Sequence, residues 1–408
     1  MASTTAAPGA AISPRRKVIN FLTKNSMTIA LVLVFILFAI LTGGRLMFAQ
    51  NMSNLLLQNG YVLVLACGML LCILTGGNID LSVGSVICLV GGLAAVLITN
   101  NGWNSYLAIL VCLVAGLAIG SWQGYWIGFV RIPPFITTLA GMFIFRGMGR
   151  LVLENKTVPM QTAAFNNLFT SYINIPGLDL ISTKENPVEN PHIWSPLIIG
   201  GIVVLLLFLL TTRSRLNKKK NGYHMNSVYM DYGKAAVISA LIMWYCWKLS
   251  QYKGISVMLV WVLAVCSIYY FITSKTTVGR YFYAVGGNEK ATKLSGINTN
   301  KIYFLAYANM GLLAGLCGML CLARVGSVSG QTGTSFEMDA IASCFIGGAS
   351  AYGGSGTVGG VVIGAMLLGV LNMGMSILGF TDSWQYVVKG SVLLVAVIFD
   401  VVSKRKKG

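Results

Sequence analysis

The polar residues that could do chemistry in this chain are few, and the most distinctive of them interrupts an apolar stretch. Asp80 lies in the segment Gly76-Gly77-Asn78-Ile79-Asp80-Leu81-Ser82, between two apolar runs and with no Lys or Arg within thirty residues. A carboxylate in such surroundings normally faces a cavity, a partner, or the free amide groups at a helix N-terminus. Two compatible interpretations follow: Asp80 or Ser82 caps the helix that begins there, or the segment lines a polar path.

Most kinds of catalysis are excluded by the residues that the chain lacks. Only two histidines occur, His192 and His224, and neither lies in an apolar segment, so a Ser/His/Asp constellation is not expected. No G-x-x-x-x-G-K-[ST] loop occurs, so the chain has no phosphate cradle of that type. The nine cysteines are scattered without a C-x-x-C pair, which supports neither a disulfide framework nor a His/Cys metal site. We expect no enzyme, no catalytic residues, no metal and no cofactor.

The elements that position these residues are apolar and of bilayer length. Of 408 residues, 56% are hydrophobic and 10% are charged, whereas a soluble domain carries about a quarter charged residues. Predominantly apolar stretches close to the ~20 residues of a membrane-crossing helix occur at 27–41, 55–75, 105–130, 196–211, 254–273 and 302–322. Backbone groups in lipid must bond internally, and the alternation of a membrane β-barrel is missing. The predicted fold is all-α, a polytopic membrane protein with about 10–12 transmembrane or half-spanning helices.

Basic residues indicate which loops face the cytoplasm. Lys and Arg number 29 against 11 acids, and most lie in clusters at 15–24, 213–220, 275–301 and 404–407. Such clustering in loops is typical of membrane topology, not of a nucleic-acid surface. We predict a cytoplasmic N-terminal tail at 1–24, a single transmembrane domain at 25–403 and a basic cytoplasmic tail at 404–408. Within that domain we expect an outer loop at about 154–194 and cytoplasmic loops at about 212–234 and 274–301.

Glycines form two kinds of pattern. Gly116, Gly120, Gly124 and Gly128 recur every fourth residue, as do Gly356, Gly360 and Gly364, and such stripes are typical of closely packed helices. Two further glycine-rich segments, at 75–85 and 347–360, each interrupt an apolar run. Paired interruptions in a membrane protein often mark internal repeats around a central path, and 338–349 is short enough to be a half-helix.

The break at 76–85 is expected to line or gate that path, because its freed backbone groups would find no partners in lipid. Charged residues near other apolar segments, such as Glu337 and Lys389, are mostly explained by helix-end positions and snorkelling. The predicted path or gate residues are Gly76, Gly77, Asn78, Asp80, Ser82, Ser85 and Asp339.

Three ordered motifs resemble a known family. They are Leu74-Thr75-Gly76-Gly77-Asn78-Ile79-Asp80-Leu81-Ser82-Val83-Gly84-Ser85, the loop 278–298 with Gly286-Gly287-Asn288-Glu289, and the run from Met338-Asp339-Ala340 to Gly353-Gly354-Ser355-Gly356-Thr357. They are similar to the permease subunits of bacterial ABC sugar importers of the ribose, galactoside and xylose type. The extra length around 212–255 resembles the longer xylose or multiple-monosaccharide permeases.

The resemblance implies a multi-pass subunit of the bacterial inner membrane, with both termini cytoplasmic, that translocates monosaccharides. Its implied partners are a second permease copy, a cytoplasmic ATP-binding subunit that hydrolyses ATP, a periplasmic sugar-binding protein and membrane lipid. It also implies an ATPase-coupling loop. The residues of that loop are Gly286, Gly287, Asn288, Glu289, Leu294, Ser295 and Gly296.

A secondary transporter coupled to an ion gradient is the alternative. Such a protein would bind its coupling ion through intramembrane acids, for which Asp80, Glu337 and Asp339 are the candidates. The long basic loop before Ile302, which a partner ATPase would need, favours the importer.

Overall fold

The computed structural model describes residues 25–160, 162–176, 178–179, 193–223 and 227–405. The predicted N-terminal tail at 1–24, residues 180–192 of the predicted outer loop, and 406–408 of the basic tail lie outside the described residues. His192 and His224 lie outside them as well.

The first half of the chain forms five long helices in the predicted order. They are α2 (Ser26–Leu41), α3 (Ala49–Leu74), α4 (Val83–Ala95), α5 (Ser105–Tyr125) and α6 (Pro134–Val152). A short helix η1 (Arg45–Met47) precedes α3, while the π-helical turns η2 (Val96–Asn100) and η3 (Trp126–Val130) extend α4 and α5. Local sequence sets two of the starts: Asn104 accepts the Tyr106 N–H at the start of α5, and α6 begins at Pro134.

After α6, the described residues form the short α7 and nine further helices. They are α7 (Ala163–Phe169), α8 (Ser195–Lys220), α9 (Val228–Ser250), α10 (Val257–Lys275), α11 (Thr277–Gly287), α12 (Glu289–Leu294), α13 (Thr299–Val325), α14 (Phe336–Ile346), α15 (Val358–Ile377) and α16 (Asp382–Arg405). Much of the predicted loop at 212–234 continues α8 and α9, and the loop at 274–301 contains α11 and α12.

Two small antiparallel pairings join the loops at one end of the helices. β1 (Val158–Pro159) pairs with β4 (Ser327–Val328), and β2 (Tyr172–Ile173) pairs with β3 (Ile255–Ser256). The segment after α6 is thereby tied to the ends of α13 and α9.

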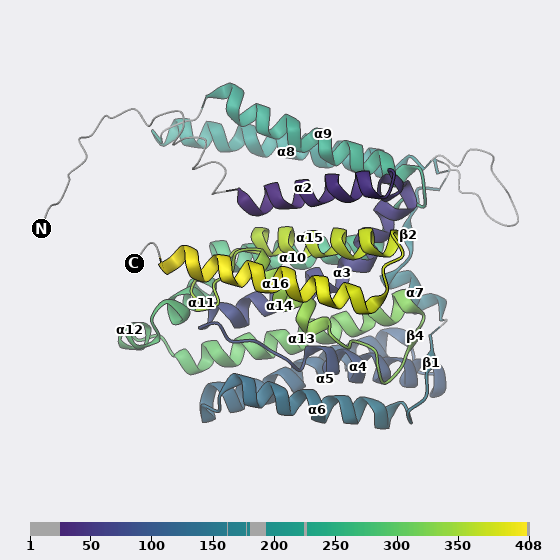
Figure 1. Cartoon of the computed structure of the whole chain (residues 1–408), viewed down its shortest axis with the longest axis vertical. Coiled ribbons are helices and arrows are strands. Elements are labelled where there is room, and N and C mark those ends of the chain that lie inside the picture. Colours follow the sequence, from purple (N-terminus) through teal and green to yellow (C-terminus); the bar gives the residue numbers. More distant parts are fainter. Residues whose placement is uncertain (1–24, 161, 177, 180–192, 224–226, 406–408) are drawn as a thin grey trace, which may run out of the picture.

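The helix set agrees with the predicted polytopic α-helical membrane protein. Among the described residues, eight helices are long and apolar enough to cross a membrane: α3, α4 with η2, α5 with η3, α6, α8, α10, α13 and α15. The apolar α2 is shorter, α9 and α16 run beside the others (Figure 1), and α14 has only 11 residues. These four bring the set within the predicted ten to twelve.

The core of the bundle is built on α3 and α13. In each of them 78% of the membrane-length stretch is buried, against 28% in α5 and 17% in α8. The outer helices therefore present their apolar side chains outward, which is stable in lipid and costly in water.

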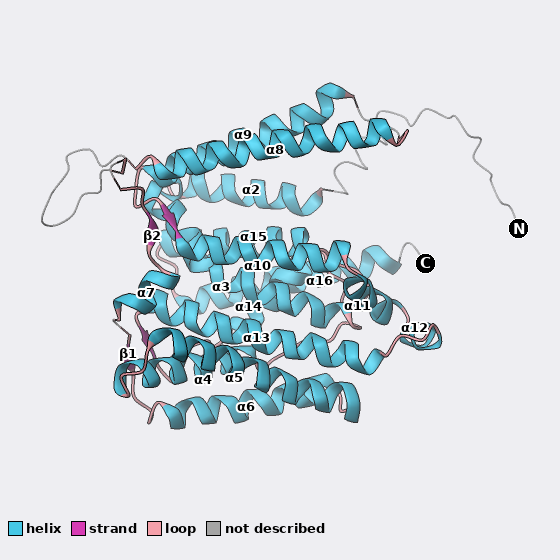
Figure 2. Cartoon of the chain, turned by 180° about the vertical axis from the view of Figure 1, so that it is seen from behind, coloured by secondary structure: helices cyan, strands magenta, loops and turns pink. Residues whose placement is uncertain are grey.

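The two ends of the bundle carry different features. Figures 1 and 2 show β1, β2 and α7 at one end, here called the strand end, and α12 at the other, here called the α12 end. The basic segments 213–220 and 275–301 both lie at the α12 end. This is the one-sided arrangement that the positive-inside rule requires.

The glycine stripes make close helix contacts, as predicted. A Cβ added at Gly120 would lie 2.4 Å from the Tyr307 carbonyl oxygen of α13, and one at Gly364 would lie 2.1 Å from the Ser343 carbonyl oxygen of α14. Any larger residue would push the helices apart, so these glycines set the distance between backbones.

Candidate functional site

The break after α3 packs directly against the break after α14. Gly76 and Gly77 have φ of +125° and +78°, a conformation that side-chain-bearing residues rarely adopt. A Cβ added at Gly77 would lie 2.0 Å from the Ala351 carbonyl oxygen, and one at Gly353 would lie 2.4 Å from the Gly76 Cα. The two glycine-rich interruptions seen in the sequence therefore touch through their backbones.

The end of α11 joins the same contact. Leu74 O accepts the Gly354 N–H at 3.0 Å, and a Cβ added at Gly286 would lie 1.8 Å from that same oxygen and 2.5 Å from the Gly354 nitrogen. Sequence reasoning missed this convergence of the three motifs. We call Gly76, Gly77, Gly286, Gly353 and Gly354 the glycine junction.

Asp80 stabilises the turn that starts α4. Its Oδ1 accepts the Ser82 N–H at 2.8 Å and the Ser82 Oγ–H at 2.7 Å, and Gln123 Nε2 donates to Ser82 Oγ at 2.8 Å. Ser82 is the N-cap residue of α4, and no side chain there accepts an N–H of the helix itself. The carboxylate thus holds the turn just before the helix, and Gln123 ties that turn to α5. Gln123 was not among the predicted residues.

The predicted path residues around this turn differ in exposure: Gly76 is exposed, and Gly77 and Asn78 are half-buried. Asp80, Ser82 and Ser85 are at most 1% exposed, and the Ser85 hydroxyl finds no hydrogen-bond partner in the described part of the chain. Asn78 Nδ2 donates to the Thr75 carbonyl oxygen at 3.3 Å. The role of the break as a path or gate stays a prediction.

Asp339 belongs to a different cluster, although it was predicted with the same group. It accepts Lys389 Nζ at 3.0 Å and Tyr61 Oη at 3.1 Å, and the Tyr61 ring stacks on Phe336 with centroids 3.8 Å apart. Tyr61 precedes Leu74 by about 20 Å along α3 at 1.5 Å per residue. Lys389 has an anionic partner that is itself 5% exposed, so snorkelling alone does not explain it.

The predicted coupling loop consists of α11, α12 and the turns around them. Asn288 starts α12 by accepting the Ala291 N–H at 3.0 Å, and Gly296, with φ +82°, follows its end. Gly286 is half-buried in the junction, whereas the other predicted residues except Glu289 are exposed, and Leu294 is 90% exposed. The role of these residues in coupling stays a prediction.

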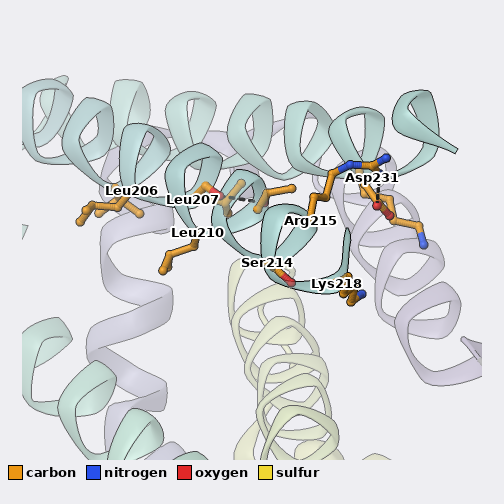
Figure 3. Close-up of a pocket in the computed structure, with 10 residues that line it drawn as sticks. Leu206, Leu207, Leu210, Ser214, Arg215, Lys218 and Asp231 are labelled. Atoms are coloured by element: carbon orange, nitrogen blue, oxygen red, sulfur yellow. Dashed lines mark hydrogen bonds and ion pairs between the residues drawn. The ribbon is translucent and has the colours of Figure 1, made fainter. Parts of the chain in front are cut away.

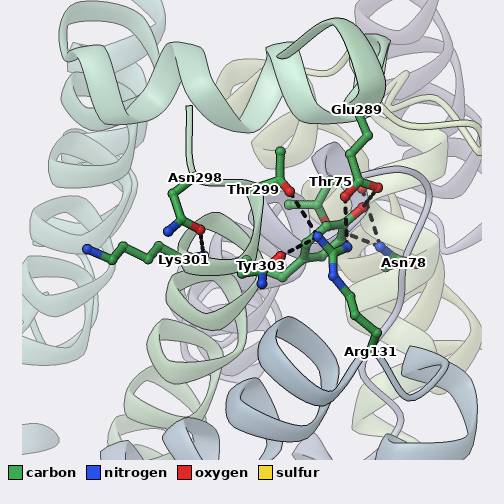
Figure 4. A network of polar contacts seen from close by, with 9 residues as sticks. Thr75, Asn78, Arg131, Glu289, Asn298, Thr299, Lys301 and Tyr303 are labelled. Carbon is green, nitrogen blue, oxygen red and sulfur yellow. Dashed lines mark hydrogen bonds and ion pairs between the residues drawn. The ribbon is translucent and has the colours of Figure 1, made fainter. Parts of the chain in front are cut away.

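Glu289 fastens α12 to two other helices (Figure 4). It accepts Arg131 Nη1 at 2.7 Å and Tyr303 Oη at 3.0 Å, while Arg131 Nη2 donates to Thr299 Oγ1 at 2.9 Å and to Asn300. Arg131 also lies 5.0 Å from the centre of the Tyr303 ring. Burial alone would raise the pKa of Glu289, but the hydrogen bonds from Arg131 and Tyr303 and the Arg131 charge outweigh it and lower that pKa.

Arg131 and Tyr303 were missed by sequence reasoning. Arg131 ends the α5–η3 helix with φ +68° and was visible only as a single basic residue after a long apolar run. Such a residue is typical of a helix end, and nothing in its sequence neighbourhood indicated an acid 158 positions away.

These features define a class of protein. A bundle of membrane-length helices, two broken segments that pack against each other where α3 ends, and a polar helical loop joined to both breaks are the parts of a membrane transport permease. The chain belongs to the family described as "Branched-chain amino acid transport system / permease component", whose model matches residues 51–397.

Relatives extend over nearly the whole chain. The "Xylose transport system permease protein XylH" of Haemophilus influenzae is 36% identical over 382 residues, 93% of this chain and 96% of that protein. The protein of the same name from Escherichia coli K12 is 34% identical over 93% of this chain and 92% of that protein. No solved structure matches the chain.

A third relative matches a shorter stretch. The "Ribose import permease protein RbsC" of Escherichia coli K12 is 39% identical over 142 residues, 35% of this chain and 44% of that protein. The resemblance drawn from three motifs is therefore confirmed. The chain is a transport permease, and the comparisons give no support to a secondary transporter coupled to an ion gradient.

Proposed function

We propose that this chain is the permease subunit of an ATP-driven monosaccharide importer and that xylose is its first candidate substrate. Two relatives that match 93% of the chain are xylose permeases by name. The observation that carries the proposal is the glycine junction, which joins the loop suited to an ATPase to both broken segments.

The proposed ATP-binding subunit docks on α12. Leu294 offers an apolar anchor, and Asn288, Ser295 and Gly296 surround it as exposed polar and small residues. Arg131 and Glu289 hold α12 against α13 and the end of η3. A force on α12 therefore moves α12 together with these two helix ends. Because nothing but backbone separates α11 from Leu74 and Gly354, a displacement of α11 reaches both breaks directly.

The remaining partners and the orientation are part of the same proposal. The α12 end is cytoplasmic, since the two described basic loops lie there and basic loops stay inside. The strand end is then periplasmic, where a sugar-binding protein delivers its ligand, and a second copy completes the path. Both termini lie in the cytoplasm of a bacterium whose inner membrane holds the chain.

The test is uptake by proteoliposomes that contain this chain, its ATP-binding partner and the sugar-binding protein. We expect xylose uptake to need ATP on the α12 side and to survive collapse of ion gradients by an uncoupler. Ribose and galactose serve as competing sugars under the same conditions. Uptake that proceeds without the ATPase and stops with the uncoupler would overturn the proposal.

Orientation has its own measurement. Ser295 is exposed on the coupling loop, so a Ser295→Cys variant gives an accessible thiol there, whereas a cysteine at Asn167, on α7, reports the strand end. A membrane-impermeant maleimide applied to intact spheroplasts should label the cysteine at 167 and spare the one at 295. The reverse pattern would show that the topology is inverted.

A further inference from the structure

A groove of about 550 Å³ lies between α8 and α9 (Figure 3). One wall is apolar and consists of Val203, Leu206, Leu207 and Leu210. Leu206 and Leu210 are 50% and 64% exposed, so this wall opens to the surroundings of the bundle. In a membrane those surroundings are acyl chains.

The mouth of the groove is basic. Arg215, Lys218 and Lys234 line it together with a single acid, Asp231. Asp231 forms an ion pair with Arg215, and the two side chains are only 20% and 14% exposed. Lys218 and Lys234 have no ion-pair partner among the residues that the structure describes, so the mouth keeps two positive charges in excess.

The pair of helices is held in register at this mouth. Thr212 and Tyr232 share a hydrogen bond at 3.0 Å, the Tyr232 ring stacks with Phe208, and Arg215 lies 5.9 Å from the centre of the same ring. The basic groups are therefore attached to a fixed pair of helices.

The length of the apolar wall along α8 is similar to the hydrocarbon thickness of one lipid leaflet. From Val203 to Thr211 the wall extends about 12 Å along α8, close to the ~15 Å of hydrocarbon in one leaflet. The cations follow the end of the apolar run, so with the wall in the hydrocarbon of one leaflet they lie on the side of the phosphate groups. Basic pockets between transmembrane helices at this level bind anionic lipid headgroups.

We propose that the α8–α9 groove binds an anionic phospholipid, with one acyl chain along the Val203–Leu210 wall and the phosphate between Lys218 and Lys234. A free phosphate would use only the mouth and leave the wall uncovered. A second copy of this chain is a poor occupant, because a protein with net charge +18 offers few acids to a basic mouth.

The experiment titrates the purified full-length chain in detergent with phosphatidylglycerol and counts bound lipids by native mass spectrometry. Phosphatidylcholine is the neutral probe, and glycerol phosphate is the soluble headgroup without acyl chains. We expect phosphatidylglycerol to bind tightly, phosphatidylcholine to bind weakly, and glycerol phosphate to compete poorly.

Matched variants locate the site. Lys218→Ala with Lys234→Ala should weaken phosphatidylglycerol binding about 30-fold, because each lysine near a membrane surface contributes about 1 kcal/mol. Lys219→Ala with Lys220→Ala removes the same charge from the same helix end outside the groove and should change binding less than about threefold. Leu210→Trp, at an exposed wall position, should weaken binding of the lipid and leave that of glycerol phosphate unchanged.

Three results would overturn the proposal. Equal losses of phosphatidylglycerol affinity in the two double-lysine variants would mean that any basic residue at the helix end is enough for binding. Full competition by glycerol phosphate would show a phosphate site without a lipid wall. A change of the Lys218 and Lys234 variant from dimer to monomer in size-exclusion chromatography with light scattering, with lipid binding intact, would assign the groove to a second copy.

Discussion

Replacing Gly286 by Ala should disrupt the glycine junction, and replacing its neighbour Gly287 by Ala should not. The Cβ at 286 would lie 1.8 Å from the Leu74 carbonyl oxygen, whereas real Cβ contacts essentially never fall below 3.0 Å. The two backbones must therefore separate by at least the difference, 1.2 Å. At 287 a Cβ meets no atom within 4 Å.

The magnitude follows from two opposing effects. Overpacking a closely packed site costs about 1–3 kcal/mol, and the upper part of that range applies because both neighbours of Gly286 are backbone atoms that have no other rotamer. Exchange of a helical Gly for Ala raises the free energy of unfolding by up to about 1 kcal/mol, because Ala favours the helix more than Gly does. We expect Gly286→Ala to lower the free energy of unfolding by about 2 kcal/mol. Gly287→Ala should leave it unchanged or raise it slightly.

Two assays read this pair of variants. Thermal unfolding of the purified chain in detergent should give a lower midpoint for Gly286→Ala alone. In proteoliposomes with the partner subunits, Gly286→Ala should also lower sugar uptake per ATP hydrolysed, because the separated backbones no longer transmit a shift of α11 to the breaks. Equal unfolding midpoints and equal uptake per ATP in both variants would refute the idea that the junction couples the loop to the interior.

Three further predictions concern side chains. A double-mutant cycle of Arg131→Ala and Glu289→Ala should give a coupling energy of about 0.5 kcal/mol, since both groups are more than a third exposed. Because the pKa of Glu289 is lowered in the folded chain, the coupling measured by chemical unfolding should be complete above about pH 4.5 and lost as the pH falls below it. Asp80→Asn keeps an acceptor for the Ser82 amide and should retain uptake at normal protein levels. Asp80→Leu removes that acceptor and should yield less folded protein in fluorescence-detected gel filtration. Loss of uptake in the Asn variant would instead indicate a role that depends on the charge of Asp80. Lys389→Met leaves Asp339 without its cation and should lower the free energy of unfolding by about 3 kcal/mol. Adding Asp339→Asn should restore part of that stability. If it does not, the unpaired carboxylate is not the cause of the loss.

The helices and their close contacts could be predicted because the signals are local. Bilayer-length apolar runs gave the spanning elements, and the four-residue recurrence from Gly116 to Gly128 gave a face that now packs on α13. Asp80 was also placed correctly beside the start of a helix, since the turn that it stabilises and that helix are neighbours in sequence.

The contacts that make the site depend on segments far apart in the chain. The glycine-rich segments at 75–85 and 347–360 and the loop at 278–298 could be recognised as motifs, but nothing local in them indicated that they touch. Asp339 was predicted together with Asp80 as a path or gate residue, yet its partner Tyr61 lies about 20 Å from Leu74 along α3, and its other partner, Lys389, lies on α16. Charged residues find such partners through tertiary packing, which hydropathy does not encode.

The absence of side chains at the junction bears on how a signal could cross it. A contact made through flexible side chains can absorb a small displacement by changing rotamers. The contact of Gly286 with Leu74 and Gly354 has no such freedom, because a carbonyl oxygen and an amide nitrogen of the main chain meet the α11 backbone directly. A shift of α11 must therefore either move both breaks or open the contact, and packed interfaces favour such discrete arrangements over gradual deformation.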